Sequence, residues 1–89
     1  MIVEFDKSFS KSLDKLKDSE VKRKIEHIII DFDGAKIITD IKNVKKLVGF
    51  KTYYRIRIGY YRLCIELKTN NIAKFIVIAH RKDIYKIFP

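Results

Sequence analysis

The sequence predicts an α+β fold in which an N-terminal strand and a two-helix hairpin pack on a small antiparallel β-sheet. Two periodicities support this prediction: apolar residues recur at helical spacing in the first third of the chain, and they alternate with polar residues from Phe50 onwards. The chain has 89 residues, of which 47% are hydrophobic. That suffices for one hydrophobic core and not for two, so residues 1–89 are expected to form a single domain.

The N-terminal segment is expected to form a short strand over residues 2–5, followed by a helix. Asp6 or Ser8 can accept hydrogen bonds from the free N–H groups of the first helical turn. The apolar positions of this helix follow at i, i+4 and i+7: Phe9, Leu13 and Leu16.

The second helix has the clearer pattern. Asp18 or Ser19 can cap its start, and Asp33-Gly34 is expected to end it through the tolerance of glycine for positive φ. Because about two residues separate the two helices, they are expected to run antiparallel. Five apolar positions form the buried stripe of the second helix: Val21, Ile25, Ile28, Ile29 and Phe32.

Residues 35–48 carry an ambiguous pattern. Their apolar positions have helical spacing, but asparagine, threonine and β-branched residues weaken helix formation. A short helical turn followed by irregular chain is expected here. The apolar positions concerned are Ile37, Ile41, Val44 and Val48.

A β-hairpin is predicted around Gly59-Tyr60, with glycine first as a type II′ turn prefers. A two-residue turn at this point brings three apolar pairs together on one face: Ile58 with Tyr61, Ile56 with Leu63, and Tyr54 with Ile65. Because every pair is apolar, the register is internally consistent. On the other face it places Arg55 opposite Cys64.

The last predicted strand covers residues 72–79, which are apolar on both faces, as expected for a central strand. Thr69-Asn70-Asn71 is expected to form the turn before it. The tail, residues 80–89, is polar, with three apolar residues able to pack back: Ile84, Ile87 and Phe88.

The chain is strongly basic, with 20 lysine and arginine residues against 11 acidic ones, a net charge of +9 and a pI near 9.7. This balance favours a polyanionic partner, either nucleic acid or an acidic protein. The single cysteine, Cys64, implies no disulfide framework, and two histidines and one cysteine without ligand spacing predict no metal site. No signal peptide is recognisable, and no apolar run approaches the ~20 residues that span a bilayer. A soluble cytoplasmic protein is expected.

Two arginines are predicted to face each other across the hairpin, since the register pairs Arg57 with Arg62. Like charges directly opposite each other destabilise a strand pair. A bound phosphate removes this penalty, because a guanidinium group donates two parallel hydrogen bonds to phosphate oxygens. Alternatively, both side chains extend into solvent, or Glu66 and Asp83 neutralise them. Arg55 lies on the same predicted face.

Further candidate residues follow the last strand. If that strand lies beside residues 61–68, His80, Arg81 and Tyr85 can converge on the face that carries the arginines. His80 is a candidate for direct chemistry, although a lone histidine is more often structural; Tyr85 is equally well explained by packing. Four lysines are expected to add general electrostatic attraction for RNA: Lys45, Lys46, Lys51 and Lys82.

Two motifs make the whole chain resemble the RelE/ParE superfamily of toxins from toxin–antitoxin systems, and more closely its RelE branch. They are YYRIRIGYYRL at residues 53–63 and HRKDIY at residues 80–85, with Phe88-Pro89 after the second. The resemblance implies an endoribonuclease that cuts messenger RNA in the ribosomal A site, without a metal ion or a small-molecule cofactor. It also implies a small cognate antitoxin, expected to be acidic.

The resemblance also implies roles for individual residues. Arg55 and Arg57 match the two basic strand residues of the family, and Arg62 matches the arginine that holds the phosphate. Arg81 and Tyr85 match its C-terminal pair. The prototype has lysines in place of Arg55 and Arg57, and arginine is a poor proton carrier. The general base therefore stays open, with His80, Lys82 and Tyr85 as the candidates.

Two other functions are compatible with the same fold. One is a ParE-like protein that inhibits DNA gyrase by binding it, and the other is a non-catalytic RNA- or ribosome-binding module. The arginine set favours the nuclease, because a gyrase binder has no need of a convergent phosphate site.

Overall fold

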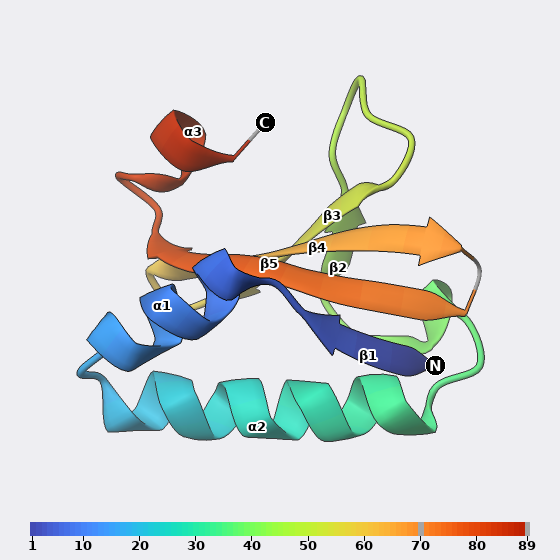
Figure 1. Ribbon diagram of the computed structural model, residues 1–89, viewed down its shortest axis with the longest axis horizontal. Coiled ribbons are helices and arrows are strands. Elements are labelled where there is room, and N and C mark those ends of the chain that lie inside the picture. Colours follow the sequence, from blue (N-terminus) through green and yellow to red (C-terminus); the bar gives the residue numbers. More distant parts are fainter. Residues whose placement is uncertain (70, 89) are drawn as a thin grey trace.

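A five-stranded sheet forms the centre of the molecule, with its strands in the order β1-β5-β4-β3-β2. The computed structural model describes residues 1–69 and 71–88. Figure 1 shows α1 and α2 on one side of the sheet and α3 on the other. The elements are β1 (Ile2–Phe5), α1 (Lys7–Lys15), α2 (Ser19–Gly34), the 3₁₀ turn η1 (Ile38–Asp40), β2 (Val44–Lys46), β3 (Tyr53–Ile58), β4 (Tyr61–Thr69), β5 (Ile72–His80) and α3 (Ile84–Ile87).

The predicted α+β class is confirmed, but the sheet is mixed and not wholly antiparallel. β1 pairs in parallel with β5, while the other neighbouring strands are antiparallel. The parallel pair follows from the connection: α1, α2 and three further strands lie between β1 and β5 in the chain. Such a long connection can return a strand in either direction, whereas a tight turn only reverses it.

The predicted helix starts are correct. The Asp6 carboxylate accepts a hydrogen bond from the backbone N–H of Ser8, and Asp18 caps α2 by accepting from two backbone N–H groups. The predicted end of α2 at Asp33-Gly34 is also correct, but the predicted mechanism is wrong. Gly34 is its last residue, and the helix ends because Ala35 turns to an extended conformation, with φ −82° and ψ 149°. No left-handed glycine is involved, since positive φ among the described glycines occurs at Gly49 and Gly59.

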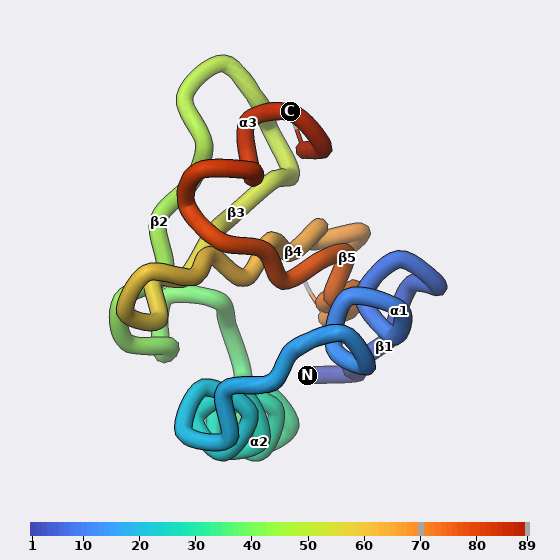
Figure 2. The backbone as a smooth tube through the Cα atoms, turned by 90° about the vertical axis from the view of Figure 1, so that its left-hand side faces the viewer, coloured from blue at the N-terminus to red at the C-terminus, as the bar shows by residue number. Residues whose placement is uncertain are grey.

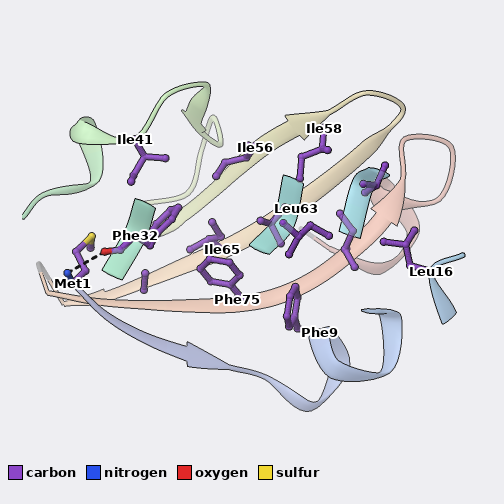
Figure 3. Packing of buried hydrophobic residues seen from close by; sticks show 14 residues of the cluster. Met1, Phe9, Leu16, Phe32, Ile41, Ile56, Ile58, Leu63, Ile65 and Phe75 are labelled. Atoms are coloured by element: carbon purple, nitrogen blue, oxygen red, sulfur yellow. Dashed lines mark hydrogen bonds between the residues drawn. The ribbon is translucent and has the colours of Figure 1, made fainter. Parts of the chain in front are cut away.

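The main core lies between the two long helices and the sheet, as Figure 3 shows. Phe75 of β5 is its centre: the rings of Phe9 and Phe32 contact it edge-on, with centroids 5.5 and 5.2 Å away. The predicted stripe of α2 supplies Val21, Ile25 and Phe32 to this core, and Ile28 and Ile29 pack at its margin. This burial holds the helices on one face and leaves the other face free for polar chemistry.

The predicted hairpin register is confirmed in full. β3 and β4 pair Ile58 with Tyr61, and Gly59 has a φ of 58°, the left-handed value that the first residue of a type II′ turn needs. The same register places Arg57 directly opposite Arg62. Pairing of apolar side chains on the helix-covered face therefore decides which residues meet on the opposite face.

The segment 35–48 differs from its prediction. The helical turn exists as η1, but the chain after it is not irregular: Val44–Lys46 form the edge strand β2, paired with β3. Three residues are too few for a readable alternation, so only the neighbouring strand defines this one.

The C-terminal tail covers part of the second face of the sheet. Ile84 and Phe88 are buried against Cys64 and Val77, whereas Ile87, predicted to pack back, is 57% exposed. The four-residue helix α3 was not predicted. Figure 2 shows it on the side of the sheet opposite α2. Phe88, directly after this helix, has its ring 5.0 Å from the ring of Tyr53. The predicted turn at residues 69–71 includes Asn70, which lies outside the described residues.

Candidate active site

Four basic side chains share the sheet face opposite α1 and α2, which we call the arginine face: Lys45, Arg55, Arg57 and Arg62. Strand pairing arranges them in two rows. Lys45 lies opposite Arg55 in one row, and Arg57 lies opposite Arg62 in the other. A cleft of about 450 Å³ opens over these four residues, with Asn43 and Gly59 at its edge.

Arg62 is the most firmly held of these side chains. It is half-buried, and its Nη1 donates to the carbonyl oxygens of Gly59 at 3.0 Å and Tyr61 at 2.9 Å. Burial lowers the pKa of this guanidinium from its ordinary value, and the positive charges of Arg57, Arg55 and Arg81 lower it further. The Arg62 site is therefore electropositive, which favours an anion.

Acidic side chains do not neutralise the arginine face. The ion pairs among residues 1–69 and 71–88 join Lys24 to Glu20, Lys68 to Glu4, and Lys74 to Asp6. Within this part of the chain, Glu66 and Asp83 form no ion pair with the arginines, in contrast to one of the alternatives considered above. The charges of the face are thus available to a ligand.

Tyr85 joins the arginine face from α3. Its hydroxyl oxygen accepts a hydrogen bond from Arg55 Nη1 at 3.0 Å, and the residue is 76% exposed. Such exposure is inconsistent with a packing role for this ring. Because the oxygen is the acceptor in this contact, the phenolic proton stays free to be donated to a ligand.

Arg81 lies at the edge of the same face. Ala79 pairs with Arg62, and Arg81 follows two residues later, just beyond the end of β5. Its backbone N–H donates to the carbonyl of Tyr60 at 2.7 Å, and its guanidinium carbon lies 5.0 Å from the centre of the Tyr60 ring. Arg81 is close enough to Arg62 for its charge to lower the pKa of that group.

His80 is not part of this group. It pairs with Tyr61, whose side chain belongs to the helix-covered face, and the two rings meet edge-on at 5.5 Å. Its Nδ1 accepts a hydrogen bond from the backbone N–H of Lys82 at 3.2 Å. The neutral imidazole then carries its proton on Nε2, so the nitrogen that would accept a proton is already occupied.

The four predicted RNA-binding lysines lie in different places. Lys45 lines the cleft, whereas Lys46 pairs with Tyr54 and so belongs to the opposite face by alternation. Lys51, in the loop between β2 and β3, and Lys82, after β5, are exposed and do not line the cleft. Only Lys45 therefore shares the arginine cleft.

Two contributors to the site were not predicted as site residues. Tyr60 was recognised only as a turn residue, and Asn43, at the rim of the cleft, has the left-handed φ of 63°. The contact of Tyr60 with Arg81 has no local signal, because it depends on where β5 ends relative to the hairpin turn.

Within the described part of the chain, no three His, Cys, Asp or Glu side chains gather into a group that could hold a metal ion. Cys64 is buried beneath α3, and this burial raises the pKa of its thiol to about 12. A thiol that stays protonated is a poor nucleophile or ligand. Among residues 1–69 and 71–88, no helix is long and apolar enough to cross a membrane.

The fold and the site together define a small basic α+β protein with a cluster of cationic side chains around a cleft on one sheet face. The chain matches no protein-family model. It is 39% identical over 90 residues to Toxin RelE3 of Methanocaldococcus jannaschii, a match that spans all of both chains. The chain therefore belongs to the RelE family of toxins from toxin–antitoxin systems.

Solved structures agree with this assignment. The RelB-RelE antitoxin-toxin complex from Methanococcus jannaschii contains a chain with a TM-score of 0.82 and 33% identity, covering 97% of this chain and 99% of its own. A double arginine-to-alanine mutant of Escherichia coli RelE in the free state has a TM-score of 0.68 and 21% identity, covering 96% of this chain and 90% of its own. At that identity, the second match demonstrates the fold alone.

Proposed function

We propose that this toxin is an endoribonuclease that cuts messenger RNA in the ribosomal A site, without a catalytic metal ion. The observation that supports the proposal most directly is the set of converging cations, with the Tyr85 hydroxyl held by Arg55 beside a cleft lined by Arg55, Arg57 and Arg62. Guanidinium groups suit phosphate oxygens, and a free phenolic proton suits a departing oxygen, so this combination fits a strand of RNA.

The reaction is an attack of the ribose 2′-oxygen on the neighbouring phosphorus. A bond forms between these atoms while the bond from phosphorus to the 5′-oxygen breaks, which leaves a 2′,3′-cyclic phosphate and a 5′-hydroxyl. Arg57 and Arg62 hold the phosphate and stabilise the negative charge that grows on its oxygens. Binding in the A site supplies the alignment of the reacting atoms.

Tyr85 is the proton donor to the departing 5′-oxygen in this scheme. Its proton is free, and the positive charge of Arg55 at 3.0 Å stabilises the phenolate that forms. The proton of the 2′-hydroxyl passes to solvent. His80 has no part in either transfer, because it lies on the other face and its Nδ1 is occupied.

The partner that restrains the toxin is proposed to be a small acidic antitoxin. The net charge of +9 favours an acidic protein. Related toxins are solved as complexes with an antitoxin, among them the RelB-RelE pair from M. jannaschii. A cytoplasmic location, where both messenger RNA and ribosomes are found, is part of the same proposal.

The test is incubation with ribosomes programmed with a defined messenger RNA, with the cleavage position mapped by primer extension and the product ends identified chemically. We expect cuts within the A-site codon, with 5′-hydroxyl ends. A DNA gyrase supercoiling assay runs in parallel. Intact messenger RNA together with gyrase inhibition would show that the protein is a gyrase inhibitor.

Metal independence needs a separate test, because ribosomes themselves require Mg²⁺. A phosphorothioate at the scissile phosphate weakens binding of Mg²⁺ to the substituted oxygen, and a thiophilic ion such as Mn²⁺ restores it. We expect slow cleavage of this messenger RNA that added Mn²⁺ does not restore. Rescue by Mn²⁺ would contradict the metal-independent mechanism.

A further inference from the structure

The hairpin turn of β3 and β4 contacts the end of β5 through Tyr60. This residue is 65% exposed and lies outside the buried core. Even so, its carbonyl accepts the backbone N–H of Arg81 at 2.7 Å, and its ring lies 5.0 Å from the Arg81 guanidinium carbon. The ring also stacks on His80, with centroids 6.1 Å apart and planes inclined by 21°. Tyr60 thus makes three contacts to two consecutive residues, and each of them restricts its side chain or its backbone although the residue is exposed.

An aromatic ring can position an arginine without neutralising it. In a cation–π contact the guanidinium rests on the ring by its flat face, and the N–H donors at its edge stay free for phosphate oxygens. A carboxylate in the same place would occupy those donors and cancel the charge. Within the described residues, Arg81 has no carboxylate partner, so Tyr60 supplies the contact that restrains this flexible side chain.

We propose that Tyr60 is a positioning residue that holds Arg81 on the arginine face for the phosphate. The proposal rests on the proposed nuclease function and deepens it. The turn then organises two arginines at once, since the Gly59 carbonyl holds Arg62 while the Tyr60 ring and carbonyl hold Arg81. Tyr60 acts through Arg81 and not by touching RNA.

A double-mutant cycle in the A-site cleavage assay tests this, using wild type, Tyr60→Leu, Arg81→Ala and the double variant at saturating ribosome concentration. Tyr60→Leu is expected to lower the cleavage rate about two- to fivefold, the range that corresponds to an exposed cation–π contact. Tyr60→Phe keeps the ring and is expected to cleave like wild type. In the Arg81→Ala background, Tyr60→Leu is expected to have no further effect.

Two results would overturn the proposal. An equal loss from Tyr60→Leu with and without Arg81 would mean that the ring contacts RNA directly, and an unchanged rate in Tyr60→Leu would mean that it has no role. Phe5→Leu is the matched control. It removes a half-exposed ring that contacts Phe9 and Phe75, away from the arginine face, and should leave the rate unchanged even if it lowers stability.

A spectroscopic measurement separates this inference from the nuclease function on which it rests. Ring currents from Tyr60 should shift the Arg81 δ-methylene protons upfield in the NMR spectrum of wild type and Tyr60→Phe, and not in Tyr60→Leu. If wild type leaves messenger RNA intact but shows the shift, the proposed function fails while the positioning contact stands. Unshifted Arg81 protons in wild type would overturn the positioning inference whatever the cleavage result.

Discussion

Arg57 and Arg62 lie directly opposite each other on β3 and β4, and no described carboxylate forms an ion pair with either. Such a pair destabilises the free protein by a few tenths of a kcal/mol or more. Arg62 is further restricted by its bonds to two carbonyls of the turn. Arg62 is thus held in place although it is repelled by Arg57. An anion bound between the two guanidinium groups would relieve this repulsion.

At the residue scale, Arg62→Ala and Arg81→Ala are each expected to lower A-site cleavage by about tenfold or more, because one charge-stabilising contact contributes ~2–4 kcal/mol to the transition state. Thermal unfolding should change little, since each substitution also removes a charge that repels its neighbours. Arg23→Ala, an exposed arginine of α2, is the charge-matched control and should cleave normally. Wild-type rates in both site variants would refute the site.

At the element scale, Asp6 joins the start of α1 to β5. Hydrogen bonds from Ser8, helped by Lys74, lower the pKa of the Asp6 carboxyl from 3.8 to about 2. The Lys74 ammonium lies 3.2 Å from this carboxylate. A folded-state pKa below that of the unfolded chain means that the carboxylate stabilises the fold above about pH 4 and loses this effect as the pH falls through 2.

Urea denaturation between pH 2 and pH 5 checks this. Wild type should lose stability more steeply than Asp6→Asn as the pH falls from about 4 to about 2, because asparagine keeps a capping oxygen but does not titrate. Identical pH profiles for the two proteins would mean that Asp6 does not stabilise the fold through its charge.

α3 is the element that brings Tyr85 to the sheet, and it is anchored mainly by Phe88 and Ile84. Phe88→Ala should detach α3 while the main core stays folded, because Phe88 belongs to the separate small cluster at Cys64.

Cleavage by Phe88→Ala should fall because Tyr85 moves away from Arg55. Cys64 should gain reactivity as its thiol pKa, now raised to about 12 by burial, returns toward the ordinary value of ~8.5.

The measurement is the rate of iodoacetamide modification at pH 8, followed by mass spectrometry beside the cleavage assay. We expect modification of Phe88→Ala to be about a hundredfold faster or more. Ile87→Ala changes an exposed residue of the same helix and should behave like wild type. Equally slow modification of Phe88→Ala would show that α3 is not the element that protects the thiol.

At the scale of the whole molecule, the question is how much of the net charge of +9 acts at the site. Each phosphate neutralised on a single strand contributes about −0.7 to the slope of log affinity against log salt concentration. If each of five cationic side chains binds one phosphate, the slope for a short single-stranded RNA is about −3.5. These side chains are Lys45, Arg55, Arg57, Arg62 and Arg81. Arg62→Ala should reduce its magnitude by about 0.7, whereas Arg23→Ala should not. An unchanged slope in Arg62→Ala would indicate that this arginine contacts no phosphate.

Much of the fold was readable from the chain because its signals are local. The helical stripe of α2 and the alternation on either side of Gly59 repeat over enough residues to be recognised. From the turn alone, the pairing of Arg57 with Arg62 follows by counting. The repulsion between Arg57 and Arg62 therefore follows from the sequence and its two-residue turn, without reference to any tertiary contact.

The edge strand β2, the side on which His80 lies and the contacts of Tyr60 and Tyr85 depend on the tertiary structure. Residues 72–79 are apolar on both faces, so their pattern does not tell which side each residue takes. A register shift beside Cys64 and Ile65 further offsets the alternation, and it leaves His80 opposite Tyr61 and Ala79 opposite Arg62. The arginine pair was thus determined by the sequence alone, through a two-residue turn. Which side chains surround it was decided only by the assembled sheet, because those contacts join segments that are about 20 to 30 residues apart in the chain.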